Sequence, residues 1–558
     1  MKEPKKSNLE EKLESKITEI RHKEQEARAQ ALAEKLNLPY INLTTIPIDA
    51  EALLLVPEAQ ARKGKVAVIR KSDNELRVVL ENTQNPIAQK IIADFEKQGL
   101  SCRIFIASSH SLNRAFERYR GLGKKEKEIT GEVEISQEAL TKLQTELKSL
   151  DDIKRKIETI PQDTATCILE VIIAGALQTD AYDIHLETKE NGALFRYRID
   201  GILQDVVFLS SKTYSIVISR LKLISGMVLN VRDKAQDGRF TIKLEKIEIE
   251  VRVSVIPGPD GENVVMRILN PKNINLSIKD LGFRDDAYQF IIKEIKKPNG
   301  MIITTGPTGS GKTTTLYSFL KEVTDPEIKI ITLEDPIEYH LAGVTQTQVE
   351  TEHGYTFASG LRAILRQDPD VVLVGEIRDE ETADIAIQAA LTGHIVFSTL
   401  HTNDAAGAIP RFIDMGANPT TLSAALIDIM AQRLLRRVCS ACKEEYPPTA
   451  EEKNKIKMAL EGLPKTVAAP DISKDYKLAR GKGCPKCNNT GYKGRVGVYE
   501  IIPVDPDLEK LITKSPSHAE ILELIKKKNF VSMYQDGILK VLQKITTLEE
   551  LEDIVGER

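Results

Sequence analysis

The sequence predicts an α/β protein: a domain with a parallel sheet, preceded by an antiparallel α+β domain and a small α/β module. Two observations predict the parallel sheet. Apolar runs are each followed by helical periodicity at 301–304, 328–333, 371–374 and 395–399, and this alternation is typical of a parallel sheet with helices on both faces. In addition, Gly306–Thr313 follows the first run with the pattern G-x-x-x-x-G-K-[ST] of a phosphate-binding loop.

The composition is that of a large multidomain protein. A length of 558 residues corresponds to about three or four domains. The 78 Lys and Arg residues against 82 Asp and Glu residues give a net charge of −4, which offers no general attraction to nucleic acid or to an anionic membrane. No apolar stretch reaches the roughly 18 residues of a membrane-spanning helix, and the charged start lacks the apolar core of a signal peptide. We therefore expect a cytoplasmic protein with no stable nucleic-acid partner.

The amino-terminal part divides by composition. Residues 1–35 are rich in Glu, Lys, Arg and Ala and are predicted to form a charged helical extension. Residues 36–120 alternate short apolar runs with helical segments, which predicts the small α/β module. Residues 121–157 carry many charges and few apolar clusters, so we expect a linker there.

Residues 158–280 are predicted to form the antiparallel α+β domain. Alternating apolar residues flank Asp200-Gly201, a dipeptide that strongly indicates a two-residue hairpin turn. Further strands are expected over 240–256 and 264–269, with a helix over 214–226. The remaining boundaries that we expect are 281–436 for the parallel-sheet domain, 437–500 for a four-cysteine subdomain and 501–558 for a carboxyl-terminal helical region.

The loop after the first parallel strand has the residues that bind a nucleoside triphosphate. Its glycines let successive backbone N–H groups point at phosphates, at the positive end of the following helix. Lys312 can reach the β and γ phosphates, and the Thr313 hydroxyl can take one position on Mg²⁺. The predicted nucleotide contacts are Gly306, Pro307, Thr308, Gly309, Ser310, Gly311, Lys312, Thr313, Thr314, Glu334 and Asp335.

Carboxylates follow two other predicted strands. Glu376 comes directly after the strand 371–374, where an acidic group can order Mg²⁺ or the attacking water. Glu338 follows the strand that ends at Leu333 and is a candidate general base, with Glu334 and Asp335 as Mg²⁺ or structural partners. Position alone leaves the choice of base open between Glu338 and Glu376.

Two histidines bracket the predicted strand 395–399. His401 lies just past its carboxyl end, where a group that senses the γ phosphate has to be, so we predict a functional role for it. His394 precedes the strand, and its functional and structural interpretations are balanced.

Four of the six cysteines form two C-x-x-C pairs, Cys439 with Cys442 and Cys484 with Cys487. In a cytoplasmic chain such thiolates stay reduced and suit Zn²⁺. Four sulfur ligands leave no open position, so the predicted zinc site is structural. A redox role as two thioredoxin-like pairs is the alternative, but no thioredoxin-type context surrounds them.

Taken together, these motifs resemble the secretion ATPase superfamily, specifically its type II secretion and type IV pilus assembly branch. The resemblance covers nearly the whole chain, because the segments before the phosphate loop also match. It is carried by 183–187, 198–201, 236–239, 251–254, 306–313, 334–338, 375–376, 392–394 and 401–403. It implies a RecA-like ATPase core, a PAS-like domain before it, and ATP with Mg²⁺ as cofactors.

The resemblance also implies partners. Members of this family form homohexameric rings that act on an inner-membrane platform protein, so we expect peripheral association with the inner face of the cell membrane through partners. The cysteine pairs match the assembly ATPases rather than the retraction ATPases of the family, which favours pilus extension or secretion. Some amino-terminal modules of the family bind cyclic di-GMP through an Arg-Leu-Gly opening, which this chain lacks before Leu36, so that regulation is not assigned.

Three arginines are candidates for neutralising charge that develops on the γ phosphate, and the first two named here are similar in placement to the family's catalytic arginines. They are Arg252, Arg267 and Arg239, the last of which could equally pair with a carboxylate in a hairpin turn. Two other functions stay open. A nucleic-acid motor is disfavoured by the near-neutral charge and the lack of aromatic stacking residues, and a non-catalytic nucleotide-gated adaptor is disfavoured by the presence of candidate bases and arginines.

Overall fold

The computed structural model describes residues 24–556, except 44–45, 47, 50–51, 54, 73–74, 98, 123–131, 135–142, 144, 162–163, 245–246, 271–275, 465–466, 469 and 473–474. Most of the predicted charged extension and about half of the predicted linker therefore lie outside the described residues. The chain divides into two compact units, Met1–Thr130 and Gly131–Arg558, and each is described by itself.

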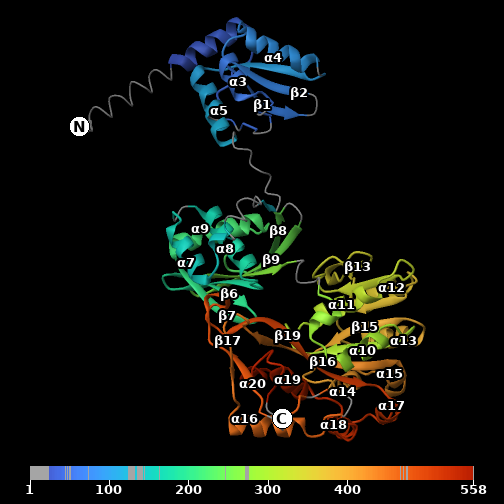
Figure 1. The fold of residues 1–558 in the computed structure, drawn as a ribbon. Coiled ribbons are helices and arrows are strands. Elements are labelled where there is room, and N and C mark those ends of the chain that lie inside the picture. Colours follow the sequence, from blue (N-terminus) through green and yellow to red (C-terminus); the bar gives the residue numbers. More distant parts are fainter. Residues whose placement is uncertain are drawn as a thin grey trace, which may run out of the picture. The chain divides into compact units, whose positions relative to one another are not determined.

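The first unit is a small α/β domain around a three-stranded sheet of order β1-β2-β3 (Figure 1). The strands β1 and β2 are antiparallel, and β2 and β3 are parallel because α4 crosses between them. Its core contains Val68, Val79 and Ile106, all nearly free of solvent contact. The elements are α3 (Glu58–Gly64), β1 (Val66–Ser72), β2 (Glu75–Leu80), α4 (Pro86–Lys97), β3 (Ser101–Ile106) and α5 (Ser109–Leu122).

The second unit begins with an antiparallel α+β domain, as predicted. Its seven-stranded sheet has the order β4-β8-β9-β10-β5-β6-β7, and the short strand β4 forms its single parallel pair. Asp200 and Gly201 both have positive φ, 49° and 90°, as a two-residue hairpin turn requires. The elements are β4 (Glu132–Glu134), α7 (Leu150–Thr159), α8 (Ala165–Gln178), β5 (Asp183–Lys189), β6 (Gly192–Ile199), β7 (Ile202–Ser210), α9 (Ser211–Ile224), β8 (Gln236–Leu244), β9 (Ile247–Gly258) and β10 (Gly261–Leu269).

One face of that sheet packs against helices. Tyr197 of β6 is completely buried, and its hydroxyl donates a hydrogen bond to the carbonyl of Ile172 on α8. Ile153 and Ile157 of α7 are buried in the same core. The opposite face includes charged side chains such as Arg252 and Arg267, since successive residues of a strand point to opposite faces. This alternation is what leaves arginines available on the face turned away from the helices.

The parallel sheet follows, with the order β13-β12-β14-β15-β11-β16-β19. All pairs are parallel except β16 with β19. The α/β fold class with a parallel sheet is thereby confirmed. The elements are η2 (Ile278–Leu281), α10 (Asp285–Glu294), β11 (Gly300–Thr305), α11 (Lys312–Val323), β12 (Ile330–Glu334), β13 (Thr345–Gln348), η3 (Thr351–His353), α12 (Phe357–Leu365), β14 (Val371–Val374), α13 (Glu380–Leu391), β15 (Ile395–Leu400), α14 (Ala408–Asp414), α15 (Pro419–Ala425) and β16 (Leu426–Val438).

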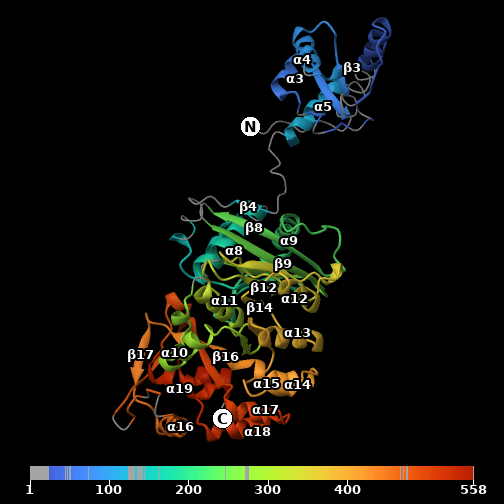
Figure 2. The same ribbon diagram turned by 90° about the vertical axis from the view of Figure 1, so that its right-hand side faces the viewer.

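Helices cover both faces of the sheet. Every residue of β11 is buried, and its side chains alternate between two cores. Met301 and Ile303 pack with α12–α15, whereas Ile302 packs with α10 and α11. Figure 2 shows α13, α15, α17 and α18 in succession, and each of these helices contacts the next. The continuous apolar runs in the sequence reflect this burial on both faces.

The carboxyl-terminal part completes the sheet and adds helices. Asp536 of α19 is fully buried, where it accepts hydrogen bonds from Arg284, Lys540 and the backbone N–H of Tyr499. Three donors compensate the desolvation of this carboxylate, so α19 is tied to β19 and to the start of α10. The elements are β17 (Lys443–Tyr446), α16 (Ala450–Leu460), β18 (Leu478–Gly481), η4 (Pro485–Cys487), β19 (Tyr492–Pro503), α17 (Pro506–Ile512), α18 (His518–Lys527), α19 (Met533–Leu542) and α20 (Leu548–Val555).

A second buried carboxyl group has no such compensation. Asp428 of β16 is fully buried, and neither of its carboxylate oxygens has a hydrogen-bond partner among the described residues. Burial, together with the nearby Glu294, raises the pKa of Asp428 to about 8 against the opposing charge of Lys297. The group is therefore a neutral acid in the folded protein at neutral pH.

Asp428 predicts a pH dependence of stability. Because its pKa is higher in the folded chain, the folded state holds a proton that the unfolded chain releases above about pH 4. The stabilisation of the folded state by this proton is complete below about pH 4 and is lost as the pH rises through about 8. Between these two pH values the free energy of unfolding falls by about 1.4 kcal/mol per pH unit. We expect Asp428→Asn to lack this decline, and thermal unfolding of both proteins from about pH 5 to about pH 9 measures it. The same decline in both proteins would contradict the assignment.

Candidate functional site

The phosphate loop lies between the buried strand β11 and the helix α11. Gly306, Gly309 and Gly311 have positive φ values of 148°, 80° and 91°, a conformation that L side chains rarely adopt. Gly311 is the N-cap residue of α11, so the backbone N–H groups of the first helical turn face the loop. A Cβ atom on Gly306 would lie 2.7 Å from the carbonyl oxygen of Gln432 on β16. The loop residues thus form a close-packed cradle that fits a triphosphate.

Lys312 is held by the loop itself. Its ammonium group donates hydrogen bonds to the carbonyls of Gly306 (2.7 Å) and Pro307 (3.1 Å). Burial lowers the pKa of Lys312 to about 8; Glu376 opposes this shift and Arg433 adds to it. The amine is therefore held against its own loop and loses its proton at a lower pH than an ordinary lysine does.

A cavity of about 340 Å³ opens at the carboxyl ends of β11, β12, β14 and β15. Ligands of parallel α/β sheets bind at this edge. The cavity brings together most of the predicted site residues, from the loop, the acidic segment and the strand ends. The predicted residues that line it are Thr308, Gly309, Ser310, Gly311, Lys312, Thr313, Thr314, Glu334, Asp335, Glu338, Glu376, His401 and Arg267.

Glu376 is contacted through both carboxylate oxygens. Arg378 forms an ion pair with Oε1, and Nε2 of His401 lies 3.5 Å from Oε2. The side chain of Glu376 is only 13 % exposed. The neighbouring Thr399 hydroxyl donates to the carbonyl of Gly375 at 2.8 Å, which fixes the end of β14 against β15. The carboxylate is thus oriented by side chains from the strand end and from the loop after β15.

Glu334 and Glu338 differ in environment although they are four residues apart. Glu334 is buried and accepts hydrogen bonds from the hydroxyls of Thr332 and Tyr317 and from the side-chain amide of Gln346. Its hydrogen bonding is therefore largely internal to the domain. Glu338 lies at the cavity, where burial raises its pKa against the opposing charges of Arg252 and Arg267. A carboxylate with a raised pKa and access to the cavity has the properties of a general base.

The arginines lie at different distances from the cavity. Arg267 lines it, and its Nε donates to Oδ1 of Asp183 at 2.9 Å. Arg252 does not line it, but its guanidinium is 3.8 Å from Glu338 and donates to the carbonyl of Ile337. Arg239 is exposed on β8, opposite Arg252 in the register of the sheet. Of the three predicted arginines, Arg267 and Arg252 therefore lie near the acidic segment, and Arg378 also reaches it, at 4.0 Å from Asp335.

The two histidines also separate. His401 lines the cavity, as the sequence predicted from its place after the strand. His394 lies at the amino end of β15, the opposite end from the cavity, where its Nδ1 is 3.0 Å from the carbonyl of Ala389 at the end of α13. This contact favours the structural interpretation of His394.

Sequence reasoning missed several lining residues. Arg378 stands two residues after Glu376. Its closeness in sequence to a predicted catalytic carboxylate could have identified it as a site residue. Tyr182, Tyr317 and Tyr339 also line the cavity, but they lie in different segments and carry no motif. Tyr182 reaches the cavity through the packing of the antiparallel domain near the acidic segment, which no local pattern encodes.

The four paired cysteines form one cluster. The sulfur atoms all lie within 4.8 Å of one another, with separations of 4.0 Å for Cys439–Cys484, 3.8 Å for Cys442–Cys487 and 3.7 Å for Cys484–Cys487. A tetrahedral zinc ion with metal–sulfur bonds of about 2.3 Å needs sulfur separations of about 3.8 Å. All four are free cysteines. The cluster therefore fits a structural Zn²⁺ with four thiolate ligands.

Fold and site together define a phosphate-loop ATPase, since a buried parallel strand leads into the phosphate loop and carboxylates follow the neighbouring strands. Comparison with known proteins places the chain within that class. Residues 162–553 match the family described as Type II/IV secretion system protein, and residues 36–126 match the MshEN domain. The chain belongs to this Type II/IV secretion system family, whose cofactors are ATP and Mg²⁺.

Curated relatives carry names from both branches of the family. The type IV pilus assembly ATPase PilB of Thermus thermophilus is 38 % identical over 94 % of this chain, which spans 57 % of that relative. PilB of Myxococcus xanthus is 37 % identical over 93 % of this chain and 89 % of its own length. The type II secretion system protein E of Aeromonas hydrophila is 44 % identical over 70 % of this chain and 75 % of its own length.

A solved structure shares the fold. The ATPase DotB of Yersinia pseudotuberculosis has a TM-score of 0.51 and 20 % identity, covering 70 % of this chain and 93 % of that one. Among the described residues, no helix is both long enough and apolar enough to cross a lipid bilayer.

Lys312 predicts a pH dependence of nucleotide binding. Its pKa of about 8 belongs to the loop conformation with its ammonium on the Gly306 and Pro307 carbonyls, whereas bound phosphates favour the charged amine. We expect the affinity for a non-hydrolysable ATP analogue to fall by up to about tenfold per pH unit above that pKa. Lys312→Arg, which stays charged, is the matched control. A wild-type affinity that stays constant from about pH 7 to about pH 9.5 would contradict the interpretation.

The cysteine cluster predicts a metal content. We expect about one Zn²⁺ per chain, and Cys484→Ser should lose most of it because three thiolates hold zinc less tightly than four. Atomic emission on purified protein gives the content, and Cys167→Ser, at an exposed cysteine outside the cluster, is the control. Equal zinc content in wild type and Cys484→Ser would show that the cluster is not the zinc site.

Proposed function

We propose that this chain is a cytoplasmic ATPase that works as a homohexameric ring at the inner face of the cell membrane. There it drives type IV pilus assembly or type II secretion by moving an inner-membrane platform protein. The observation that carries the proposal is the single cavity in which Lys312 of the phosphate loop, two candidate carboxylates and Arg267 of the preceding domain converge. Membership of the family and the names of its pilus assembly and secretion relatives support the same activity.

The residues of the site divide the work of hydrolysis. ATP brings the scissile phosphate, and Mg²⁺ on the Thr313 hydroxyl would neutralise part of its charge. Lys312 leaves the Gly306 and Pro307 carbonyls and pairs with the β and γ phosphates. Glu338 or Glu376 accepts the proton of the attacking water, and His401 and Arg378 hold Glu376 in place. Arg267 stabilises the charge that develops on the γ phosphate.

A ring gives a role to surface residues that the site of a single chain does not use. Arg239 is exposed on the same sheet face as the register partner Arg252, so it is available to a neighbouring subunit. Val228 and Leu229 are 59 % and 41 % exposed in the loop after α9. The Gln236 side chain holds that loop by bonding both the N–H and the C=O of Val228. Apolar side chains held rigidly at the surface are typical of protein interfaces.

The first test combines turnover with assembly. Steady-state ATP hydrolysis is measured beside light scattering after gel filtration, with and without a non-hydrolysable ATP analogue. We expect hexamers, and a loss of about 10² or more in kcat for Glu376→Gln. Glu381→Gln, at an exposed carboxylate of α13 paired with Arg362, should leave kcat unchanged.

Two outcomes would contradict the proposal. A protein that binds the analogue but neither assembles nor hydrolyses ATP would favour the nucleotide-gated adaptor instead. Unchanged turnover in Glu376→Gln would remove that residue from the mechanism.

A further inference from the structure

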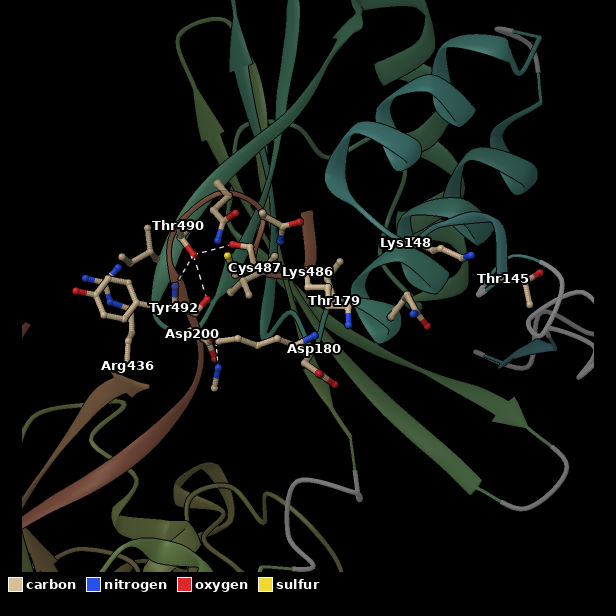
Figure 3. A pocket seen from close by; sticks show the side chains of 17 residues that line it. Thr145, Lys148, Thr179, Asp180, Asp200, Arg436, Lys486, Cys487, Thr490 and Tyr492 are labelled. Atoms are coloured by element: carbon tan, nitrogen blue, oxygen red, sulfur yellow. Dashed lines mark hydrogen bonds between the residues drawn. The ribbon is translucent and has the colours of Figure 1, made fainter. Parts of the chain in front are cut away.

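The antiparallel domain touches the region after the zinc cluster through a hairpin turn. Asp200 occupies the turn between β6 and β7, and its Oδ2 accepts a hydrogen bond from the backbone N–H of Gly494 at 2.8 Å (Figure 3). The two residues are 294 positions apart in the chain. Beside this contact lies a cavity of about 590 Å³, lined by residues of both regions. The Asp200–Gly494 hydrogen bond therefore joins the two regions at the edge of this cavity.

A second contact lies one residue further along β19. The guanidinium of Arg495 stands over the ring of Tyr182, 4.9 Å from its centroid, a distance at which the cation is attracted to the ring face. Tyr182 lines the nucleotide cavity together with Arg267. The beginning of β19 therefore contacts the antiparallel domain next to the residues that face the nucleotide.

The hairpin turn is linked to Arg267 by a chain of polar contacts. Nη1 of Arg198 donates to the carbonyl of Gly201 in the turn (3.1 Å), and its Nε is 3.5 Å from Oδ2 of Asp183. The other oxygen of Asp183 accepts from Nε of Arg267 at 2.9 Å. Asp183 is almost fully buried, so a displacement of the turn changes the hydrogen bonding of a carboxylate that has little water to replace it.

The cysteine cluster lies at the other end of this chain of contacts. The Thr490 hydroxyl donates to the carbonyl of Cys487 (2.7 Å) and accepts from the N–H of Tyr492 (3.2 Å), two residues before Gly494. Figure 3 shows Cys487, Thr490, Tyr492 and Asp200 in succession along this side of the cavity. Ligation of Cys487 thus constrains the loop that presents the Gly494 N–H group.

We infer that Asp200 is a positioning residue for ATP hydrolysis. It fastens the arginine-bearing domain to the zinc-stabilised loop and so holds Arg267 at the nucleotide. The kinetic part of this inference, the effect of Asp200 on ATP hydrolysis, rests on the proposed function. The mechanical part, the attachment of the hairpin turn to the zinc-stabilised loop, does not. The zinc cluster then has a second consequence besides its own stability, because it sets the orientation of a group in another domain.

The mechanical part is tested by amide hydrogen exchange on the full zinc-loaded chain, with no hydrolysis measured. Asp200→Gly removes the acceptor and suits the positive φ of the turn, so the peptide containing Gly494 should exchange faster. Asp200→Asn keeps an acceptor oxygen and should restore protection. Asp260→Gly, in the β9–β10 turn of the same sheet, is the control. Removal of zinc with a chelator should also speed exchange at 199–203, and unchanged exchange there would overturn the zinc link.

The kinetic part is tested by steady-state hydrolysis with the same variants. We expect Asp200→Gly to lower kcat by about tenfold with KM within about twofold, since an arginine that acts on developing charge contributes in the transition state. Asp200→Asn should restore kcat, and Arg495→Ala should lower it in the same way if Asp200→Gly fails to fold. A rise in KM alone, or a kcat equal to that of Asp260→Gly, would overturn the positioning role. If the wild type does not hydrolyse ATP, the proposed function fails while hydrogen exchange still decides the contact.

Discussion

Burial of β11 on both faces is the constraint on which the nucleotide site depends. The strand runs between β15 and β16, and its side chains alternate between two apolar cores, so its carboxyl end cannot shift without disturbing both. The phosphate loop leaves this end so close to β16 that Gly306 has no room for a side chain. The hydroxyl of Thr315 in α11 donates to Oε1 of Gln432 on β16 at 2.9 Å. Strand, loop and helix are therefore positioned by the sheet before any ligand binds, which reduces the entropic cost of binding.

The antiparallel pair β16–β19 connects this constraint to the rest of the second unit. Glu500 of β19 accepts a hydrogen bond from the N–H of Ala405, in the loop that follows His401. Tyr499 of the same strand is fully buried and bonds Asp536 of α19. At its other end β19 carries Gly494 and Arg495, which contact the antiparallel domain. One strand thus contacts the loop that follows His401, the carboxyl-terminal helices and the antiparallel domain that carries the arginines. A displacement of one of these three parts therefore affects the contacts of the other two through β19.

Local patterns in the sequence predicted what local chemistry determines. The strands of the parallel sheet are continuous apolar runs because both faces are buried. The residue spacing in the phosphate loop is set by phosphate binding, and the spacing in the cysteine pairs is set by metal binding. Asp200-Gly201 formed the predicted turn because both residues tolerate positive φ. The sequence did not reveal that Asp200 would bond Gly494, or that Tyr182 would reach the nucleotide cavity, because such contacts depend on how two domains pack. By contrast, the places of His401 after and His394 before the strand 395–399 distinguished the two in the sequence, and they lie at opposite ends of β15.

Several charged groups of the site contact polar or charged groups of the protein itself. Lys312 bonds carbonyls of its own loop, Arg378 pairs with Glu376, and Arg252 lies near Glu338. In the proposed mechanism Lys312 exchanges its contacts with the loop carbonyls for contacts with phosphates, while Arg378 and His401 keep Glu376 oriented. On this proposal nucleotide binding replaces contacts within the protein by contacts with phosphates, so its net free energy is smaller than the new contacts alone would provide. The same proposal places Arg267 of the antiparallel domain at the γ phosphate, so the state of the nucleotide would be coupled to the position of that domain, which is the movement that a mechanical ATPase requires.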